Sequence, residues 1–397
     1  MKKLKLYKPD LIIDGNGGKP IENGFLLVED NKIIKIGKSV DLNLDNQVEI
    51  IELRGKTIMP GVIDSHVHIT IDPDPDFTGF LGRDSYTKIV LRGLKNLKKT
   101  LDGGVTYFRD LGGYEFIDIE LNKCLKEGLI DGPDFLASGK MITMTGGHGW
   151  SIGRECDGVS EVRKAAREQI KAGADIVKIM ATGGNLTKGT KPGAAQLTEE
   201  EIRAAVEEAH KAGKKTTTHA HGAEGIKNAI LAGIDCIEHG MYIDDEALEM
   251  MAEKGVYYVP TLYAPWICAE IGEEGGLDLE AVKKTKESTA RHMESFKNAI
   301  KHNVKIGMGT DAGTPFCEHG NGYVGEMKLM VKGGYTPMEA IVAATKVSSE
   351  ILGINEKYGT LEEGKIADFI VLDENPLNNL DILYNIRNVY KNGVKVK

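Results

Sequence analysis

The chain has 397 residues, of which 41% are hydrophobic and 27% are charged, and its formal net charge at pH 7 is −9. This balance excludes a disordered chain, and an acidic chain without basic blocks is a poor candidate for binding nucleic acid or anionic membranes. No apolar run approaches the ~18 residues that a transmembrane helix needs.

The five cysteines are scattered and form no CxxC pair, which argues against a disulfide framework and against a thiolate zinc site. The basic N-terminus is not followed by an apolar stretch, so we expect no signal peptide. These features predict a cytoplasmic protein without a nucleic-acid or membrane partner.

Short β-branched runs lie near both ends of the chain, between glycine, asparagine and aspartate turns. They are 11–13, 25–29, 33–36 and 48–53 at one end, and 367–372, 386–389 and 394–396 at the other. Neither set is large enough for an independent sheet, so we expect the two ends to pair in one small β-sandwich. The predicted domains are this sandwich, residues 1–58 plus 357–397, and a central domain, residues 59–356.

The central domain alternates short apolar runs with helical stretches. The candidate strands are 61–66, 104–109, 134–138, 175–180, 215–219, 234–238, 256–260 and 305–310. The candidate helices are 85–101, 115–128, 160–172, 198–212, 222–232, 245–254 and 278–302. A capping box at Thr198 and Glu201 supports one helix start. Eight strands alternating with helices predict an α/β fold, a (β/α)8 TIM barrel.

Histidines and an aspartate stand at the C-terminal ends of the predicted strands, where barrel enzymes place their chemistry. His66 and His68 lie two residues apart, so both imidazoles face the same side of an extended chain. His219, His239 and Asp311 follow strands five, six and eight. Imidazole and carboxylate are zinc-type ligands, so the pattern predicts a catalytic metal site.

Lys178 lies in the fourth strand, between isoleucine, valine and methionine residues. A lysine there is costly unless it is paired or neutralised. It can be a strand lysine that reaches an edge, or a lysine carboxylated by CO₂ whose two oxygens bridge two metal ions.

Several motifs resemble those of the amidohydrolase superfamily. Residues 59–68 (MPGVIDSHVH) resemble the motif that leads into its barrel, and residues 364–376 (GKIADFIVLDENP) resemble the motif that returns to the outer sheet. Residues 144–149, the Lys178 strand and the HAHG motif at 219–222 resemble a group of cytoplasmic Xaa-Pro dipeptidases and Xaa-Arg/Lys carboxypeptidases. Ochratoxin-hydrolysing amidases share these motifs.

The resemblance implies two divalent metal ions, with zinc as the expected metal, bridged by carboxylated Lys178. The implied ligands of the more buried ion are His66, His68, Lys178 and Asp311, and those of the more exposed ion are Lys178, His219 and His239. A metal-bridging hydroxide would attack the carbonyl of an amide or peptide bond next to a free carboxylate.

Further catalytic roles are implied for three residues. Asp311 would take a proton from the hydroxide and pass it to the leaving nitrogen, because an amide anion is a very poor leaving group. The resemblance implies that His148 holds the substrate or the developing oxyanion; the alternative is a loop histidine without a role. Tyr242 lies three residues past His239, so it could donate its phenol O–H to the same oxyanion or to the substrate carboxylate, or it could be a packing tyrosine. The expected substrates are dipeptides or N-acyl amino acids, with Xaa-Pro ahead of Xaa-Arg/Lys, and we expect a homo-oligomer.

The remaining histidines are weaker candidates. His221 could replace His219 as a ligand, because it lies two residues further along the same strand. His319 could line the pocket, although we expect it to be exposed to solvent. Surface positions are expected for the histidines in predicted helices, which are His210, His292 and His302.

Three alternatives remain open. A mononuclear deaminase or cyclic amidase on this fold would carry a glutamate at position 222, where this chain has glycine. A catalytically silent scaffold would lack ligands that this chain retains. A lactonase or phosphotriesterase activity is compatible with the same residues. Substrate specificity is expected in the loops 72–84, 185–197 and 263–278.

Overall fold

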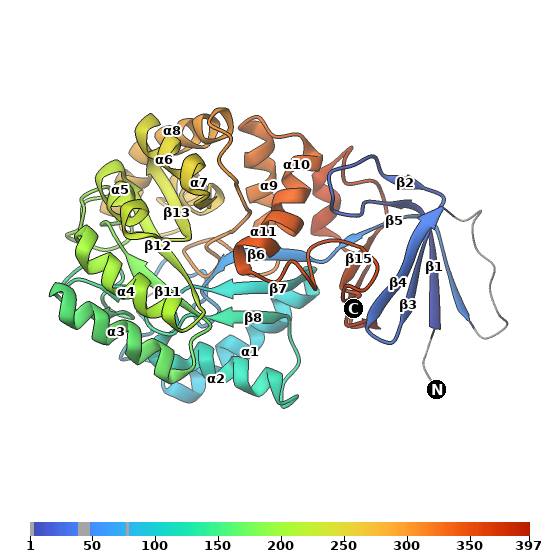
Figure 1. The fold of residues 1–397 in the computed structure, drawn as a ribbon, viewed down its shortest axis with the longest axis horizontal. Helices are drawn as coiled ribbons and strands as arrows, with labels where there is room; N and C mark the ends of the chain where they lie inside the picture. Colours follow the sequence, from blue (N-terminus) through green and yellow to red (C-terminus); the bar gives the residue numbers. More distant parts are fainter. Residues whose placement is uncertain (1–3, 39–47, 77–78) are drawn as a thin grey trace.

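Both chain ends contribute strands to one sheet, at the right of the ribbon in Figure 1. The computed structural model describes residues 4–38, 48–76 and 79–397. The strands of this sheet are β1 (Leu4–Ile12), β2 (Ile21–Glu22), β3 (Gly24–Glu29), β4 (Lys32–Lys38), β5 (Glu49–Pro60), β15 (Phe369–Leu372), β16 (Asn388–Lys391) and β17 (Val394–Lys395).

The predicted pairing of the two ends is confirmed, because β15 runs antiparallel to β5 with Phe369 opposite Pro60. The order β17-β16-β15-β5-β1-β3-β4 forms one hydrogen-bonded sheet, with β2 paired to β1. Alternation along β1 places Tyr7 and Leu6 in different apolar clusters. The predicted domain boundaries stay predictions, and β5 continues past position 58 almost to the first barrel strand.

The barrel strands run parallel to one another, as predicted. They are β6 (Val62–Val67), β7 (Val105–Asp110), β8 (Asp134–Ala137), β11 (Ile176–Met180), β12 (Lys215–Gly222), β13 (Cys236–Tyr242) and β14 (Tyr257–Val259). The amide of Asp175, just before β11, donates to the carbonyl of Ala137 at 2.7 Å and connects β8 to β11.

The eighth predicted strand, 305–310, is only partly regular. It contains an isolated bridge from Ile306 to Tyr258, and the amide of Ser65 in β6 donates to the carbonyl of Met308 at 3.0 Å. This stretch therefore closes the barrel between β14 and β6. Gly309 allows the close approach, because a Cβ there would lie 2.9 Å from Cβ of His66.

The predicted helices surround the barrel as α1 (Tyr86–Asp102), α2 (Ile117–Lys126), α3 (Gly158–Ala172), α4 (Glu199–Lys211), α5 (Ala223–Ala232), α6 (Asp245–Lys254) and α8 (Leu279–Lys301). The capping box between Thr198 and Glu201 is confirmed at the start of α4. In α4, Ile202, Ala205 and Ala209 are buried, the spacing of a helix face that packs on a barrel.

Other helical elements were not expected from the sequence. They include α7 (Tyr263–Ile271), α9 (Gly322–Lys332), α10 (Pro337–Val342), α11 (Ser348–Leu352), the short turns Tyr114–Phe116 and Leu380–Tyr384, and a π-helical turn Ala343–Val347. The prediction of a loop over 263–278 was wrong for the stretch that forms α7. The short strands β9 (Ile142–Thr143) and β10 (Arg154–Glu155) follow β8. Across the described residues, no helix has the length and apolar character to cross a bilayer.

Candidate metal centre

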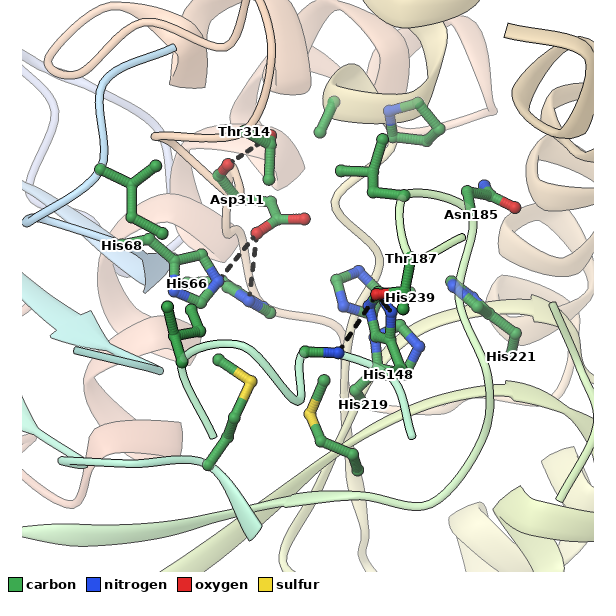
Figure 2. A pocket seen from close by; sticks show the side chains of 18 of the residues that line it. His66, His68, His148, Asn185, Thr187, His219, His221, His239, Asp311 and Thr314 are labelled. Carbon is green, nitrogen blue, oxygen red and sulfur yellow. Dashed lines mark hydrogen bonds and ion pairs between the residues drawn. The ribbon is translucent and has the colours of Figure 1, made fainter. Parts of the chain in front are cut away.

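A cavity of about 370 Å³ lies at the C-terminal ends of the barrel strands. This is the end at which barrel enzymes carry their active sites. Figure 2 shows imidazole and carboxylate groups pointing into the cavity from several elements. All six residues predicted to bind metal line it, namely His66, His68, Lys178, His219, His239 and Asp311.

His66, His68 and Asp311 form the tightest group. The Nε2 atoms of His66 and His68 lie 3.3 and 3.2 Å from Oδ1 of Asp311 (Figure 2). One ligand atom from each of the three lies within 4.8 Å of the others. The two histidines come from the end of β6, and the amide of Asp311 donates to the carbonyl of His66 at 2.8 Å. The barrel closure therefore brings the carboxylate to the two imidazoles.

Two of the predicted ligands have unusual backbone conformations. Asp311 has φ 62° and His239 has φ 70°, the left-handed region that side chains other than glycine rarely occupy. Such conformations cost free energy and are concentrated at functional sites, where the surrounding structure holds them in place. Their occurrence at these two ligands supports a functional role for the cluster.

Lys178, His219 and His239 complete the group from the neighbouring strands β11, β12 and β13. All three side chains are buried. The ring centroids of His219 and His239 are 4.6 Å apart, and those of His239 and His66 are 4.9 Å apart. His239 therefore connects the second set of predicted ligands to the first.

Burial and the neighbouring charges shift the pKa values of the predicted ligands in different directions. Burial alone would lower the pKa of His68, but the hydrogen bond with Asp311 raises it above the usual value. Burial lowers the pKa of His66 to about 4 and holds the pKa of His219 and His239 well below the usual value, so these imidazoles are neutral. Burial alone would raise the pKa of Asp311, but His66 and the other imidazole beside it lower it to about 2. Burial lowers the pKa of Lys178 to about 8. Neutral imidazoles beside an ionised carboxylate fit divalent ions such as Zn²⁺.

Three of the predicted ligand rings are each held through one ring nitrogen, as is typical of metal-binding histidines. Nδ1 of His68 lies 3.1 Å from the carbonyl oxygen of Gly112. Nδ1 of His239 lies 2.7 Å from Oγ1 of Thr261. Because Nδ1 forms the contact in both rings, Nε2 of each ring points to the other side and is available to a cation.

The third ring, that of His66, is held by a buried ion pair that sequence reasoning missed. Nδ1 of His66 lies 2.9 Å from Oε2 of Glu238, and Oε1 of Glu238 lies 2.6 Å from Nη2 of Arg109. Thr217 also donates to Glu238, and Nε of Arg109 donates to the carbonyl of Ser65 at 2.6 Å. The sequence signal that could have revealed this ion pair is Glu238, a charged residue inside an apolar strand, as Lys178 is in its own strand.

His148 lies in the loop after β9, and its ring centroid is 4.3 Å from that of His219. Its Nδ1 lies 2.7 Å from Oγ1 of Thr187, and the amide of Gly149 donates to the same oxygen at 3.2 Å. The Thr187 hydroxyl is then free to donate to Nδ1, so we assign the proton of His148 to Nε2. Burial lowers the pKa of His148 to about 4, which makes it a neutral donor.

Tyr242 is not among the residues that line the cavity within the described chain. Its phenol is hydrogen-bonded to Ser288, and its ring lies beside Gly193 of the loop that follows β11. The structure therefore brings His148 to the predicted ligands but leaves Tyr242 behind a loop. The predicted catalytic role of Tyr242 stays a prediction.

The histidines outside the predicted ligand set differ in their surroundings. His221 is buried, lines the cavity and has its ring centroid 4.4 Å from that of His219. The predicted surface position of His292 was wrong, because α8 turns this residue toward the barrel, where Nε2 donates to the carbonyl of His239 at 2.7 Å. The predicted exposure of His319 was also wrong, because it is buried against the carbonyl of Ile71.

Comparisons with known proteins identify the family of the chain. The profile of the Amidohydrolase family matches residues 57–396. The chain is 33% identical to ochratoxinase of Aspergillus niger, over 98% of this chain and 86% of that protein. A crystal structure of a Xaa-Pro dipeptidase with bound methionine superposes with a TM-score of 0.92 and 32% identity, covering all of both chains.

A prolidase in complex with N-methylphosphonate-L-proline is similar as well, with a TM-score of 0.91, 31% identity and full coverage of both chains. The family match spans the whole barrel, and the relatives match over nearly the whole chain. This chain therefore belongs to the amidohydrolase family and is a hydrolase that acts on C–N amide bonds.

Proposed function

We propose that the protein is a binuclear metal-dependent hydrolase that cleaves an amide or peptide bond next to a free carboxylate. Its substrates would be Xaa-Pro dipeptides or N-acyl amino acids. The observation that carries the proposal is that the predicted ligands of both metal positions line one cavity. The similar Xaa-Pro dipeptidase and the prolidase with its proline phosphonate support the same substrate class.

In this proposal the cluster holds two divalent ions, with zinc as the expected metal. When bound, such ions supply Lewis acidity and lower the pKa of water, so that an amide can be hydrolysed near neutral pH. Lys178 would help to hold both ions in its carboxylated form, which a buried amine of lowered pKa can reach by reaction with CO₂. The ligands would be His66, His68, Lys178 and Asp311 at one position and Lys178, His219 and His239 at the other.

The chain's own residues would then handle the protons. Asp311 is ionised and borders the cavity, so its carboxylate can accept a proton as water attacks and then pass it to the leaving nitrogen. His148 would donate its Nε2–H to the oxygen that gains negative charge or to the substrate carboxylate. Cytoplasmic location and assembly into a homo-oligomer stay predictions.

The first test combines metal analysis with a substrate screen. We expect about two metal ions per chain, together with hydrolysis of Xaa-Pro dipeptides or N-acyl amino acids. Lys178→Ala should lose nearly all activity and part of its metal, and a short carboxylic acid should restore some activity because it can replace the bridging carboxylate.

Other outcomes would point to the alternatives. A single metal ion per chain and full activity in Lys178→Ala would contradict the binuclear site and favour a deaminase or cyclic amidase. Faster hydrolysis of lactones than of any amide would contradict the proposed substrate class while leaving the metal site intact.

A further inference from the structure

The loop between β11 and α4, residues 181–197, forms one wall of the catalytic cavity through Asn185, Leu186, Thr187 and Lys188. The loop is held in place, since Nζ of Lys284 donates to the carbonyl of Thr190 at 3.0 Å. The contact between Thr187 and His148 fixes it against the neighbouring loop. Lys188 is therefore the next residue after Thr187, which contacts His148, a predicted donor to the substrate.

Lys188 differs from the other charged groups of the cavity. Asp311 faces His66 and His68, and Lys178 is buried at the floor among the predicted ligands. Lys188 is exposed and enters into no ion pair with any described residue. The other nearby cation, Lys284, does not line the cavity and pairs with Glu280 at 2.7 Å. Lys188 is thus a positively charged side chain that borders the cavity, lies outside the cluster of predicted metal ligands and has no carboxylate partner among the described residues.

The rest of the wall is mainly apolar. Met141, Ile152, Met180 and Met241 line the cavity, and Trp150, which is 50% exposed, lies on a neighbouring loop that also lines it. Apart from Asp311, no carboxylate borders the cavity within the described chain. A substrate with a positively charged side chain would therefore bind poorly, because the cavity wall is mainly apolar and Lys188 repels a cation.

We propose that Lys188 is a specificity-determining residue that binds the free carboxylate of the substrate. The inference rests on the proposed function and narrows it to N-acyl amino acids and dipeptides with apolar side chains, at the expense of Xaa-Arg and Xaa-Lys. It also supplies the carboxylate donor that Tyr242, behind the loop, was predicted to be. The lysine holds the anion away from the metal ions, where it would otherwise chelate and inhibit.

The test compares the purified metal-loaded wild type with Lys188→Ala, Lys188→Glu and the matched control Lys191→Glu. Lys191 is exposed on the same loop and does not line the cavity, so its replacement makes the same change in net charge. The substrates are an N-acyl methionine, its methylamide, and the corresponding N-acyl arginine. KM and kcat are measured for each, with the thermal midpoint as a control for folding.

We expect Lys188→Ala to raise KM for the N-acyl methionine about tenfold, with little change in kcat and little effect on the methylamide. Lys188→Glu should reverse the order of the methionine and arginine substrates, and Lys191→Glu should behave as wild type. If the wild type prefers the carboxylate substrate and Lys188→Ala keeps that preference, the inference is overturned while the proposed function stands. If the wild type cleaves the acid and the methylamide at the same rate, the proposed substrate class is overturned and the inference with it.

Discussion

In the proposed mechanism, both metal binding and proton transfer depend on Asp311. Its carboxylate contacts two histidines, and its backbone has φ 62°. Asparagine tolerates that region of φ better than most residues. Asp311→Asn should therefore fold normally but lose the group that carries the proton. We expect kcat to fall by more than the ~10²–10⁴-fold typical of acid–base catalysis, because a metal ligand is weakened too.

The measurement is kcat at saturating metal, with the metal content and thermal midpoint of the variant as controls. A loss of only tenfold, at full metal content, would show that the proton travels through another group. His148 would then be the first residue to examine, because it is the neutral donor nearest to the predicted ligands on the loop side.

Thr187 has a role that only the structure reveals, since its hydroxyl holds Nδ1 of His148. Thr187→Val removes the hydroxyl and keeps the shape, so His148 loses both its orientation and its preferred tautomer. We expect kcat/KM to fall about tenfold, the loss that follows from one neutral hydrogen bond. Thr187→Ser, which keeps the hydroxyl, should retain most activity. Equal activity in the valine and serine variants would contradict this role.

At the scale of single residues, sequence patterns identified the groups at strand ends but not their supports. His66 and His68 were visible because a two-residue spacing and an adjacent strand limit where their rings can point. Thr187 was invisible because its partner lies 39 positions away on another loop. The predicted exposure of His292 and His319 was wrong because knowing that a residue lies in a helix or a loop does not show whether its side chain points toward the core.

At the scale of elements, the ion pair of Arg109 and Glu238 joins β7 to β13 inside the barrel. Removing one partner leaves the other charge buried without compensation, which typically costs about 3–5 kcal/mol. Arg109→Met should therefore lower the free energy of unfolding by this order and weaken metal binding through His66. Urea unfolding of the metal-free protein checks the first effect, and metal titration checks the second.

Two variants make this test selective. Arg109→Met combined with Glu238→Gln should be more stable than Arg109→Met alone, because the buried charge is gone. Lys98→Met breaks an exposed pair with Asp102 and should change stability little. If the single and double barrel variants were equally stable, the buried charge would not be the cause of the loss.

Two elements could not be predicted correctly from the periodicity of the sequence. The stretch 305–310 was predicted as a strand from its apolar run, and it does close the barrel, but only isolated contacts form there. Helix α7 was predicted as part of a loop, and in the structure its N-cap residue, Leu262, makes no side-chain capping hydrogen bond. Its first amide, that of Tyr263, donates instead to Glu326 of α9 at 2.7 Å. A cap supplied from 63 residues away cannot be read from local sequence.

At the scale of the whole molecule, the barrel and the pairing of the chain ends were predictable because strand patterns recur in order along the chain. The predicted metal ligands then come from β6, β11, β12, β13 and the stretch that closes the barrel. Metal ions bound there would connect strands that are otherwise held by separate hydrogen bonds. Metal binding should therefore stabilise the entire barrel and not only the loops above it.

Removal of metal by a chelator should accordingly lower the thermal midpoint, and added Zn²⁺ should restore it. A ligand present at 100 times its dissociation constant stabilises the folded state by about 2.7 kcal/mol, provided that it binds only that state. The control is a variant with both His66→Ala and His68→Ala, whose midpoint should not respond to chelator or to Zn²⁺ to the same extent. If the chelator removes the metal and the thermal midpoint of the wild type does not change, metal binding does not stabilise the barrel.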